Sequence, residues 1–388
     1  MLNDSQPTVP IRVGVVGAGQ LARMMGEEAR AAGVTLTVLA TSPDDSAVAT
    51  SDGVIIGAPD DSAALAELVR GVDVVTFDHE LVNLDQVAVL ERAGVVVRPN
   101  ARALLFAVDK GHQRRAFDAA NIAVPRFIVI HSIDDPLLKG FLDSVGTPVL
   151  KSARGGYDGR GVLFPSSRAE TMTLIEELTA RGSVVVEERL HLRAELAQVV
   201  VRGVEGEFAA YPLVTTVQSN GMCVEVRYPA EVEQATALEA KRLGRKIATL
   251  MGGVGIIAIE FFLTDRGLIV NEVALRPHNS GHWTIEGAAT SQFKNHLLAV
   301  SGRPLGSTEP VVRSAVMVNV VGSDVEGSIS DAEHVVGAHV HDYGKSWRPG
   351  RKLGHVTVVG DDAHADHVRA WESARAYGTG TRENLWSQ

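Results

Sequence analysis

The chain has 388 residues, a hydrophobic fraction of 45% and a formal net charge of −10, a composition that favours a compact soluble protein of two or three domains. The acidic balance argues against a general surface for nucleic acid or anionic membranes, and no apolar run reaches the ~18 residues that a membrane span requires. A single cysteine, Cys223, excludes an intrachain disulfide and a cysteine-based zinc site. Because the N-terminus also lacks a signal-peptide pattern, the protein is expected in the cytoplasm.

The N-terminal part alternates apolar runs with amphipathic stretches. A strand at 11–16 leads into a glycine turn and a helix that ends at Gly33. Further strands are expected at 35–40, 74–77 and 95–99, and further helices at 63–69 and 84–93. Strands that alternate with helices predict a parallel sheet covered on both faces. Residues 1–110 are therefore expected to form a doubly wound α/β domain.

Two more units follow along the chain. Residues 111–190 are expected to form a small α+β domain, in which a helix near 109–120 precedes two strands joined by a glycine-rich loop. Residues 191–388 are expected to form a larger α+β domain. Its predicted elements are an amphipathic helix at 237–252, a hairpin at 256–274 and a β-rich tail that ends in a helix at 364–378.

The first motif is the glycine turn, with Gly17, Gly19 and Ala22 in the spacing G-x-G-x-x-A after a strand. This spacing is typical of dinucleotide binding, which also requires an acid at the end of the second strand. Here that strand ends VLAT, and the next acid is Asp44. A different phosphate ligand, or simple close packing of helix and strand, is the better interpretation.

The second motif is KSARGGYDGRG, which runs from Lys151 to Gly161. Backbone N–H groups of such a glycine-rich loop can surround phosphate oxygens, and the lysine adds a positive charge. The alternative is a hairpin whose glycines serve only the turn.

The third motif is a pair of glutamates on the hairpin at 256–274. The turn at Thr264–Gly267 places Glu260 opposite Asn271 or Glu272, and cross-strand neighbours lie about 5 Å apart. Two facing carboxylates repel each other unless they share a cation, and hard oxygen ligands favour Mg²⁺. The alternative is two glutamates that face solvent.

Two polar segments complete the candidate site. In RPHNSGHWT, His278 and His282 could bind zinc, could be ordinary loop residues or could contact a substrate; the proline, asparagine and glycine indicate a loop, which disfavours zinc and favours a substrate loop. Near the C-terminus, Lys345, Arg348, Arg351 and Lys352 cluster in an otherwise acidic chain. This cluster suits a phosphate monoester, or it is a solvated basic turn.

Taken in order, these motifs closely resemble those of the N5-carboxyaminoimidazole ribonucleotide synthetases, which are ATP-grasp ligases of purine biosynthesis. The resemblance covers about residues 11–360, and RPHNSGHWT is its most specific part. It implies an ATP-grasp fold in which residues 111–190 form the lid. It also implies that ATP and bicarbonate, with Mg²⁺, carboxylate 5-aminoimidazole ribonucleotide through carboxyphosphate, and that the enzyme is a homodimer.

The resemblance also assigns roles to individual residues. ATP contacts fall on Lys110, Lys151, Gly155, Gly156, Tyr157, Asp158, Gly159, Arg160, Gly161, Glu187, Glu188, Arg189, Leu190, Glu195, Gln218, Asn271 and Glu272. The Mg²⁺ ligands are Glu260 and Glu272. The reacting groups are surrounded by Tyr157, Asp158, Arg276, His278 and Asn279. The ribonucleotide and its phosphate are contacted by Gln20, Leu21, Glu80, Lys345, Arg351 and Lys352.

Three positions depart from the family pattern. Gln218 stands where a nucleotide-contacting histidine is usual, Leu275 replaces a common proline, and Ala274 lies where many ATP-grasp enzymes have asparagine. Two functions of other classes stay open from the sequence: an NAD-dependent oxidoreductase built on the glycine turn, and a nucleotide sensor that binds ATP without turnover.

Overall fold

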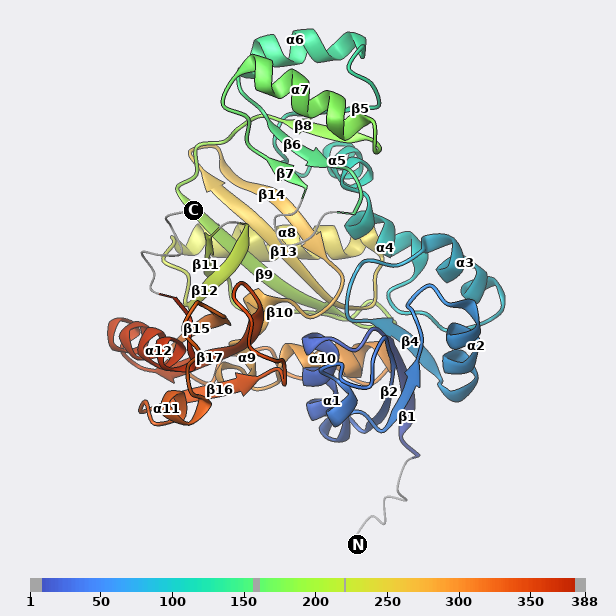
Figure 1. The fold of residues 1–388 in the computed structure, drawn as a ribbon, viewed down its shortest axis with the longest axis vertical. Coiled ribbons are helices and arrows are strands. Elements are labelled where there is room, and N and C mark those ends of the chain that lie inside the picture. Colours follow the sequence, from blue (N-terminus) through green and yellow to red (C-terminus); the bar gives the residue numbers. More distant parts are fainter. Residues whose placement is uncertain (1–8, 156–160, 220, 381–388) are drawn as a thin grey trace, which may run out of the picture.

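The computed structural model describes residues 9–155, 161–219 and 221–380. Within these ranges the strands form three sheets. Figure 1 shows a small sheet at the top of the molecule, a long sheet that runs from the centre to the lower left, and a parallel sheet at the lower right.

The N-terminal sheet is parallel, as predicted, with the strand order β3-β2-β1-β4. Buried residues of helices pack on each of its two faces. The stretch at 95–99, expected as a strand, forms only one parallel bridge, in which the Val75 N–H donates to the Val96 carbonyl and the Arg98 N–H donates to the Val75 carbonyl. The elements are β1 (Ile11–Val16), α1 (Gln20–Ala32), β2 (Val34–Ala40), η1 (Val48–Thr50), β3 (Gly53–Ile56), α2 (Ser62–Gly71), β4 (Val74–Phe77), α3 (Leu84–Arg92) and α4 (Ala101–Val108).

The small upper sheet is antiparallel, with the order β5-β8-β6-β7. Two helices cover it and contribute Leu138, Leu142 and Ile175 to a separate core. Its β6 and β7 flank the glycine-rich loop, of which residues 156–160 lie outside the described ranges. The elements are α5 (Lys110–Ala119), β5 (Phe127–Ile130), α6 (Pro136–Val145), β6 (Val149–Ser152), β7 (Val162–Leu163), α7 (Arg168–Thr179) and β8 (Val184–Glu187).

The long sheet has nine strands in the described ranges, ordered β14-β13-β9-β11-β12-β15-β17-β16, with β10 paired to β9. Its strands are β9 (Ala194–Arg202), β10 (Phe208–Ala210), β11 (Val214–Ser219), β12 (Met222–Tyr228), β13 (Gly255–Thr264), β14 (Gly267–Ala274), β15 (Ser314–Val321), β16 (Ala338–Asp342) and β17 (Lys352–Gly360). Its helices are α8 (Gln234–Met251), η2 (Asn279–Gly281), α9 (Thr284–Gly287), α10 (Gln292–Val300), α11 (Ile329–Glu333) and α12 (Ala363–Tyr377).

Helix α10 joins the long sheet to the N-terminal region. Its Phe293 is fully buried in the same core as β1, β2 and α1, and the Ser291 hydroxyl donates to Glu28 of α1 over 2.6 Å. Burial lowers the pKa of His296 to about 3, so the ring is neutral. Its Nδ1 accepts from a backbone N–H of β13, and its Nε2 lies 2.9 Å from the Thr76 hydroxyl of β4.

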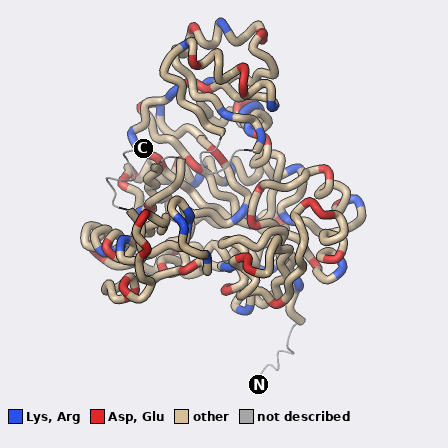
Figure 2. The backbone as a smooth tube through the Cα atoms, in the orientation of Figure 1, with Lys and Arg blue, Asp and Glu red and all other residues tan. Residues whose placement is uncertain are grey.

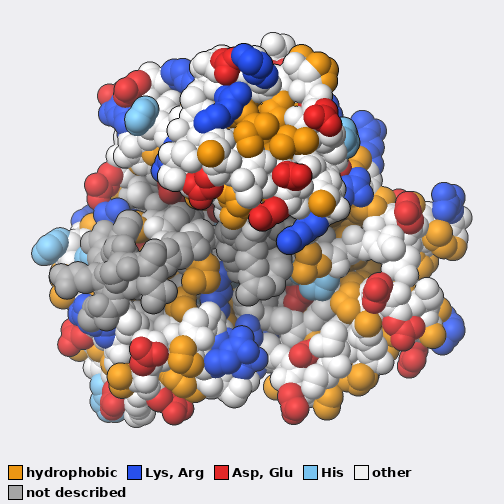
Figure 3. Space-filling view, turned by 45° about the horizontal axis from the view of Figure 1, so that its top comes forward, with side chains coloured by type: hydrophobic (Ala, Val, Ile, Leu, Met, Phe, Trp, Pro, Cys, Tyr) orange, Lys and Arg blue, Asp and Glu red, His pale blue; other side chains and the backbone are white. Residues whose placement is uncertain are grey.

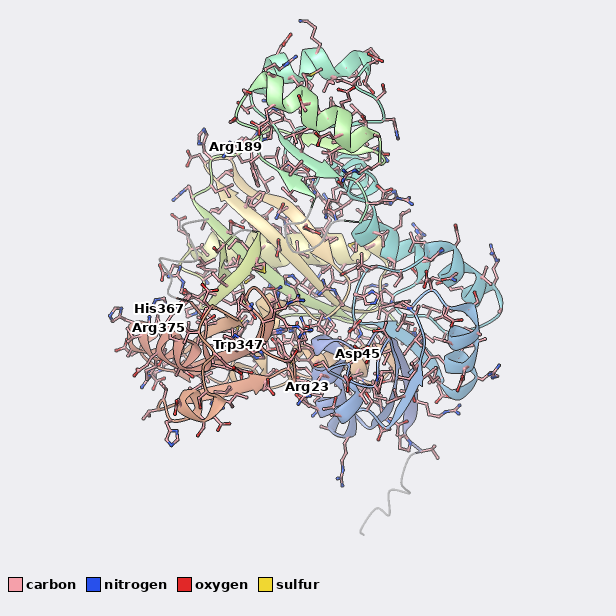
Figure 4. All side chains as sticks on the ribbon, in the orientation of Figure 1. Arg23, Asp45, Arg189, Trp347, His367 and Arg375 are labelled. Carbon is pink, nitrogen blue, oxygen red and sulfur yellow. The ribbon has the colours of Figure 1, made fainter. Side chains whose placement is uncertain are left out.

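A second junction lies between the N-terminal region and the loop from β16 to β17. Lys345 of that loop donates to the Gln20 amide oxygen over 2.6 Å. Figure 4 places Arg23 and Asp45 on the N-terminal side of the junction and Trp347 on the opposite side. The N-terminal region therefore also contacts the loop from β16 to β17.

Charged residues of both signs are interspersed along the chain in all three regions, as Figure 2 shows. Among the described residues, none of the helices has both the length and the apolar character needed to cross a membrane.

The role of α10 in joining two regions predicts a large stability cost for Phe293→Ala. Removal of a fully buried phenylalanine should lower the free energy of unfolding by about 3–5 kcal/mol. The matched control is Leu238→Ala on α8, where a side chain that is 61% exposed should change it by less than about 0.5 kcal/mol. Chemical denaturation measures both, and equal losses would contradict the shared core.

Candidate active site

The three regions enclose a cleft of about 2450 Å³. In Figure 3 the surface is notched between the two lower lobes, beneath the small upper sheet. Of the predicted site residues within the described ranges, all but Lys110 and Gly161 line this cleft. Gly156, Tyr157, Asp158, Gly159 and Arg160 lie outside the described residues. Residues predicted from separate motifs are thus brought to one cavity.

The glutamates of the hairpin face each other. Glu260 pairs directly with Glu272, and a bulge follows between Glu260 and Phe261. Burial and the neighbouring Glu272 raise the pKa of Glu260 to about 7, while the Asn271 amide donates to its Oε2 over 3.2 Å. Burial also acts against ionisation of Glu272, but Lys110, 2.7 Å away, outweighs it and lowers that pKa. Two oxygen ligands in mutual repulsion fit a Mg²⁺ ion that takes its remaining ligands from phosphates and water.

Two buried cations, Lys151 and Arg114, lie close to this pair of glutamates. Lys151 lies 2.9 Å from Glu187 and 3.1 Å from the Asn271 amide oxygen. Arg114, 1% exposed, donates to Glu187 over 2.6 Å and to the Asn271 carbonyl over 2.7 Å. Burial alone would raise the pKa of Glu187, but Arg114 and Lys151 bring it down to about 2. Sequence reasoning missed Arg114, whose helical segment offered no motif.

The segment after β8 forms a second wall of the cleft. Glu187 turns inward to Lys151, whereas Glu188 pairs outward with Arg126 and Arg266 at 2.9 and 2.6 Å. Both carboxylates therefore have partners within the protein. Farther along the chain, burial raises the pKa of Glu195, at the start of β9, to about 7.

The loop after β14 carries polar groups back toward the N-terminal sheet. Arg276 donates to Glu80 over 2.6 Å. The Ser280 N–H donates to Nδ1 of His278, and Nε2 of the same ring lies 3.7 Å from Glu260. The loop after β14 therefore reaches Glu260 of the carboxylate pair through His278 and Glu80 of the N-terminal region through Arg276.

His282 does not reach the cleft, contrary to the prediction that both histidines contact the substrate. Its side chain is fully buried, its Nδ1 lies 3.1 Å from the Gln292 amide nitrogen, and burial lowers its pKa well below the usual value. The 3₁₀ turn η2 between the histidines explains the difference, because it directs the ring of His282 inward. Within the described residues, no group of three or more His, Cys, Asp or Glu side chains could hold a metal ion.

The space beside the glycine turn is filled by a side chain of the protein. Asp78, at the end of β4, accepts from the Gly19 N–H over 2.6 Å. A Cβ atom at Gly17 would lie 1.9 Å from Oδ1 of Asp78, and one at Gly19 would lie 2.8 Å from Oδ2. The glycines therefore make room for an internal carboxylate where a dinucleotide fold would bind pyrophosphate. This geometry argues against the NAD-dependent alternative.

Comparisons with known proteins agree with this architecture. The model of the ATP-grasp domain matches residues 115–293, that of the ribonucleotide synthetase preATP-grasp domain matches 11–108, and that of the phosphoribosylaminoimidazole carboxylase C-terminal domain matches 315–367. The first match contains the small upper sheet, the hairpin of β13 and β14 and the loop that follows β14. The class of protein that the fold and site define is thus the ATP-grasp enzymes.

Similar proteins indicate which family of ATP-grasp enzymes the chain resembles. The chain is 45% identical to an N5-carboxyaminoimidazole ribonucleotide synthase of Mycobacterium bovis, over 90% of this chain and 84% of the relative, and 40% identical to one of Corynebacterium ammoniagenes, over 92% and 90%. It also matches a crystal structure of the Aspergillus clavatus synthase with ADP and 5-aminoimidazole ribonucleotide, with a TM-score of 0.85, 28% identity and coverage of 95% and 99%.

The chain belongs to the N5-carboxyaminoimidazole ribonucleotide synthase family. It is an ATP-dependent carbon–nitrogen ligase, and ATP with Mg²⁺ as its partner ion are the cofactors of its class.

The buried pair of Arg114 and Glu187 predicts a large effect of Arg114→Met. This change removes the side-chain donor to the Asn271 carbonyl and, among the described residues, leaves Lys151 as the cation paired with Glu187. Stability should therefore fall by about 3–5 kcal/mol, and the KM for ATP should rise. The control is Arg12→Met, whose pair with Asp73 faces solvent and should contribute far less. Denaturation and steady-state kinetics measure these effects; similar losses in the two variants would contradict the assignment.

Proposed function

We propose that the protein carboxylates 5-aminoimidazole ribonucleotide with ATP and bicarbonate. The products are N5-carboxyaminoimidazole ribonucleotide, ADP and phosphate, and the reaction belongs to de novo purine (IMP) biosynthesis. The name of the family and the ligands in the Aspergillus clavatus structure support this choice of substrates.

One observation carries the proposal. The hairpin that bears the carboxylate pair continues directly into the loop that bears Arg276 and His278, so the Nε2 atom of His278 lies 3.7 Å from Glu260. The phosphoryl group that is transferred and the group that accepts it would therefore lie side by side. Positioning and charge neutralisation supply most of the catalysis in phosphoryl transfer, and both are provided here by fixed side chains.

The nucleotide end of the cleft would hold ATP. Lys110 and Lys151 supply positive charge to the phosphates, and a bound Mg²⁺ ion at Glu260 and Glu272 would neutralise the charge that develops on them. Because the carboxylates of Glu187 and Glu188 are paired within the protein, the backbone at 188–190 would recognise the adenine, and Glu195 would accept a bond from the ribose.

The reaction proceeds in two transfers. A bicarbonate oxygen bonds to the γ-phosphorus as the bond from that phosphorus to the β–γ bridging oxygen breaks, which gives carboxyphosphate and ADP. The amine of the ribonucleotide then bonds to the carboxyl carbon, either directly or after release of CO₂. The C–O bond to phosphate breaks, phosphate leaves, and the amine loses a proton. Arg276, His278 and Asn279, which line the cleft, would surround these groups. Tyr157 and Asp158, to which the resemblance gives the same role, lie outside the described residues.

The opposite end of the cleft would hold the ribonucleotide. Lys345, Arg351 and Lys352 would bind its phosphate, and Gln20, Leu21 and Glu80 would contact the remainder. Lys345 already bridges to Gln20, so the contacts for phosphate and for the rest of the substrate adjoin each other. We propose residues 1–110, 111–190 and 191–388 as the domains, with 111–190 as a lid that excludes water from carboxyphosphate. We further propose a cytoplasmic homodimer.

The test of the function is an ADP-release assay in which each substrate is omitted in turn. We expect ADP formation to require Mg²⁺ and to depend on bicarbonate and 5-aminoimidazole ribonucleotide. ADP formation that ignores the ribonucleotide would overturn the substrate assignment. ATP binding without ADP release in the complete mixture would instead indicate a nucleotide sensor.

The phosphate role predicts that Lys352→Ala raises the KM for the ribonucleotide by roughly tenfold while the KM for ATP stays nearly constant, since one charge-assisted contact is lost. The matched control is Arg348→Ala, because Arg348 belongs to the same basic segment but is exposed and does not line the cleft. Steady-state kinetics of the two variants measure the difference; an equal rise in both KM values for Lys352→Ala would count against the role.

A further inference from the structure

Gln292, the first residue of α10, holds the main chain of the substrate loop at two points. Its Oε1 accepts from the backbone N–H of His278 over 3.0 Å, and its Nε2 donates to the His278 carbonyl over 2.7 Å. The side chain is completely buried and does not line the cleft. It therefore acts on His278 through the backbone, without access to substrate.

The loop is shaped around this one amide. The second proton of Nε2 points to His282, whose lowered pKa keeps its Nδ1 an acceptor. The Gln292 N–H donates to the Thr284 hydroxyl, which in turn donates to the Gly281 carbonyl. A Cβ atom at Gly281 would lie 2.3 Å from Oε1 of Gln292, so the close approach requires glycine.

Helix α10, which carries the amide, is itself anchored on both sides. Ser291 bonds to Glu28 of α1, and His296 contacts Thr76 of β4 and the backbone of β13. Through α10, the position of His278 is therefore fixed relative to both the N-terminal sheet and the hairpin of β13 and β14. No bond of Gln292 runs to the upper sheet among the described residues.

We infer that Gln292 is a positioning residue for the acceptor end of the cleft: its two bonds to the backbone of His278 set the place of that ring relative to Glu260. The identity of the acceptor rests on the proposed function. The position of the His278 ring rests on the geometry alone. A displacement of about 1 Å at a reacting group can cost as much as 10²-fold in rate, so such a clamp bears directly on turnover.

The first test is Gln292→Met, which keeps the size of the side chain but removes both bonds. We expect the KM for 5-aminoimidazole ribonucleotide to rise roughly tenfold or more, with the KM for ATP within about twofold of the original. Gln292→Glu is the second variant. It can still accept from the His278 N–H, but as a carboxylate it cannot donate to the His278 carbonyl. It should therefore also raise the ratio of the KM for the ribonucleotide to the KM for ATP, and it replaces the methionine variant if that variant does not fold.

The matched control is Gln198→Met. Gln198 is also buried, and its amide donates to the Tyr211 carbonyl rather than to the backbone of His278. This variant should lose stability but leave the ratio of the two KM values unchanged. If Gln292→Met raises both KM values equally, or if Gln198→Met changes the ratio as much, Gln292 has only a structural role and the inference is overturned.

A second readout separates this inference from the proposed function. In histidine-labelled protein without substrates, the NMR signal of the His278 ring should shift in both Gln292 variants, while that of His131 on the distant upper domain should not. An unchanged His278 signal overturns the inference, whatever the substrate is. A shifted signal in a protein that does not respond to the ribonucleotide overturns the proposed function instead.

Discussion

The arrangement of the cleft depends on the repulsion between two carboxylates that one hairpin holds face to face. Glu260 and Glu272 are direct cross-strand partners, and the neighbouring polar groups partly offset the repulsion between their carboxylates. Lys110 stabilises the charge on Glu272, whereas Glu260 has a raised pKa and receives a bond from the Asn271 amide. Such a pair is costly alone and favourable around a divalent cation, and Mg²⁺ is the usual partner ion of ATP.

The buried cations are likewise stabilised by a neighbouring group of opposite charge. Arg114 and Lys151 share Glu187, and both also contact Asn271 of the hairpin. This network ties the last residue of β8, in the upper sheet, to the strand that carries Glu272. The cost of burying each charge is offset by its partner, and Lys151 is held in place at the wall of the cleft.

The glycine turn shows how a local motif can keep its shape and change its use. Gly17 and Gly19 adopt the close approach that a dinucleotide would exploit, yet the partner is the carboxylate of Asp78. The Asp78 carboxylate accepts from the backbone N–H of Gly19 and occupies the space at this helix N-terminus where a phosphate would bind. The neighbouring side chains of Gln20 and Leu21 then line the cleft.

Much of this protein was determined by its sequence alone, because periodicity and turn chemistry are properties of adjacent residues. The parallel N-terminal sheet, the pairing of Glu260 across the hairpin and the loop from Arg276 could all be predicted in this way. Only the tertiary structure decided that Arg114 meets Glu187, that Asp78 fills the glycine turn and that His282 turns inward to Gln292. These partners lie on different elements, and which side chains meet across them is decided by how the elements pack, which no local pattern encodes.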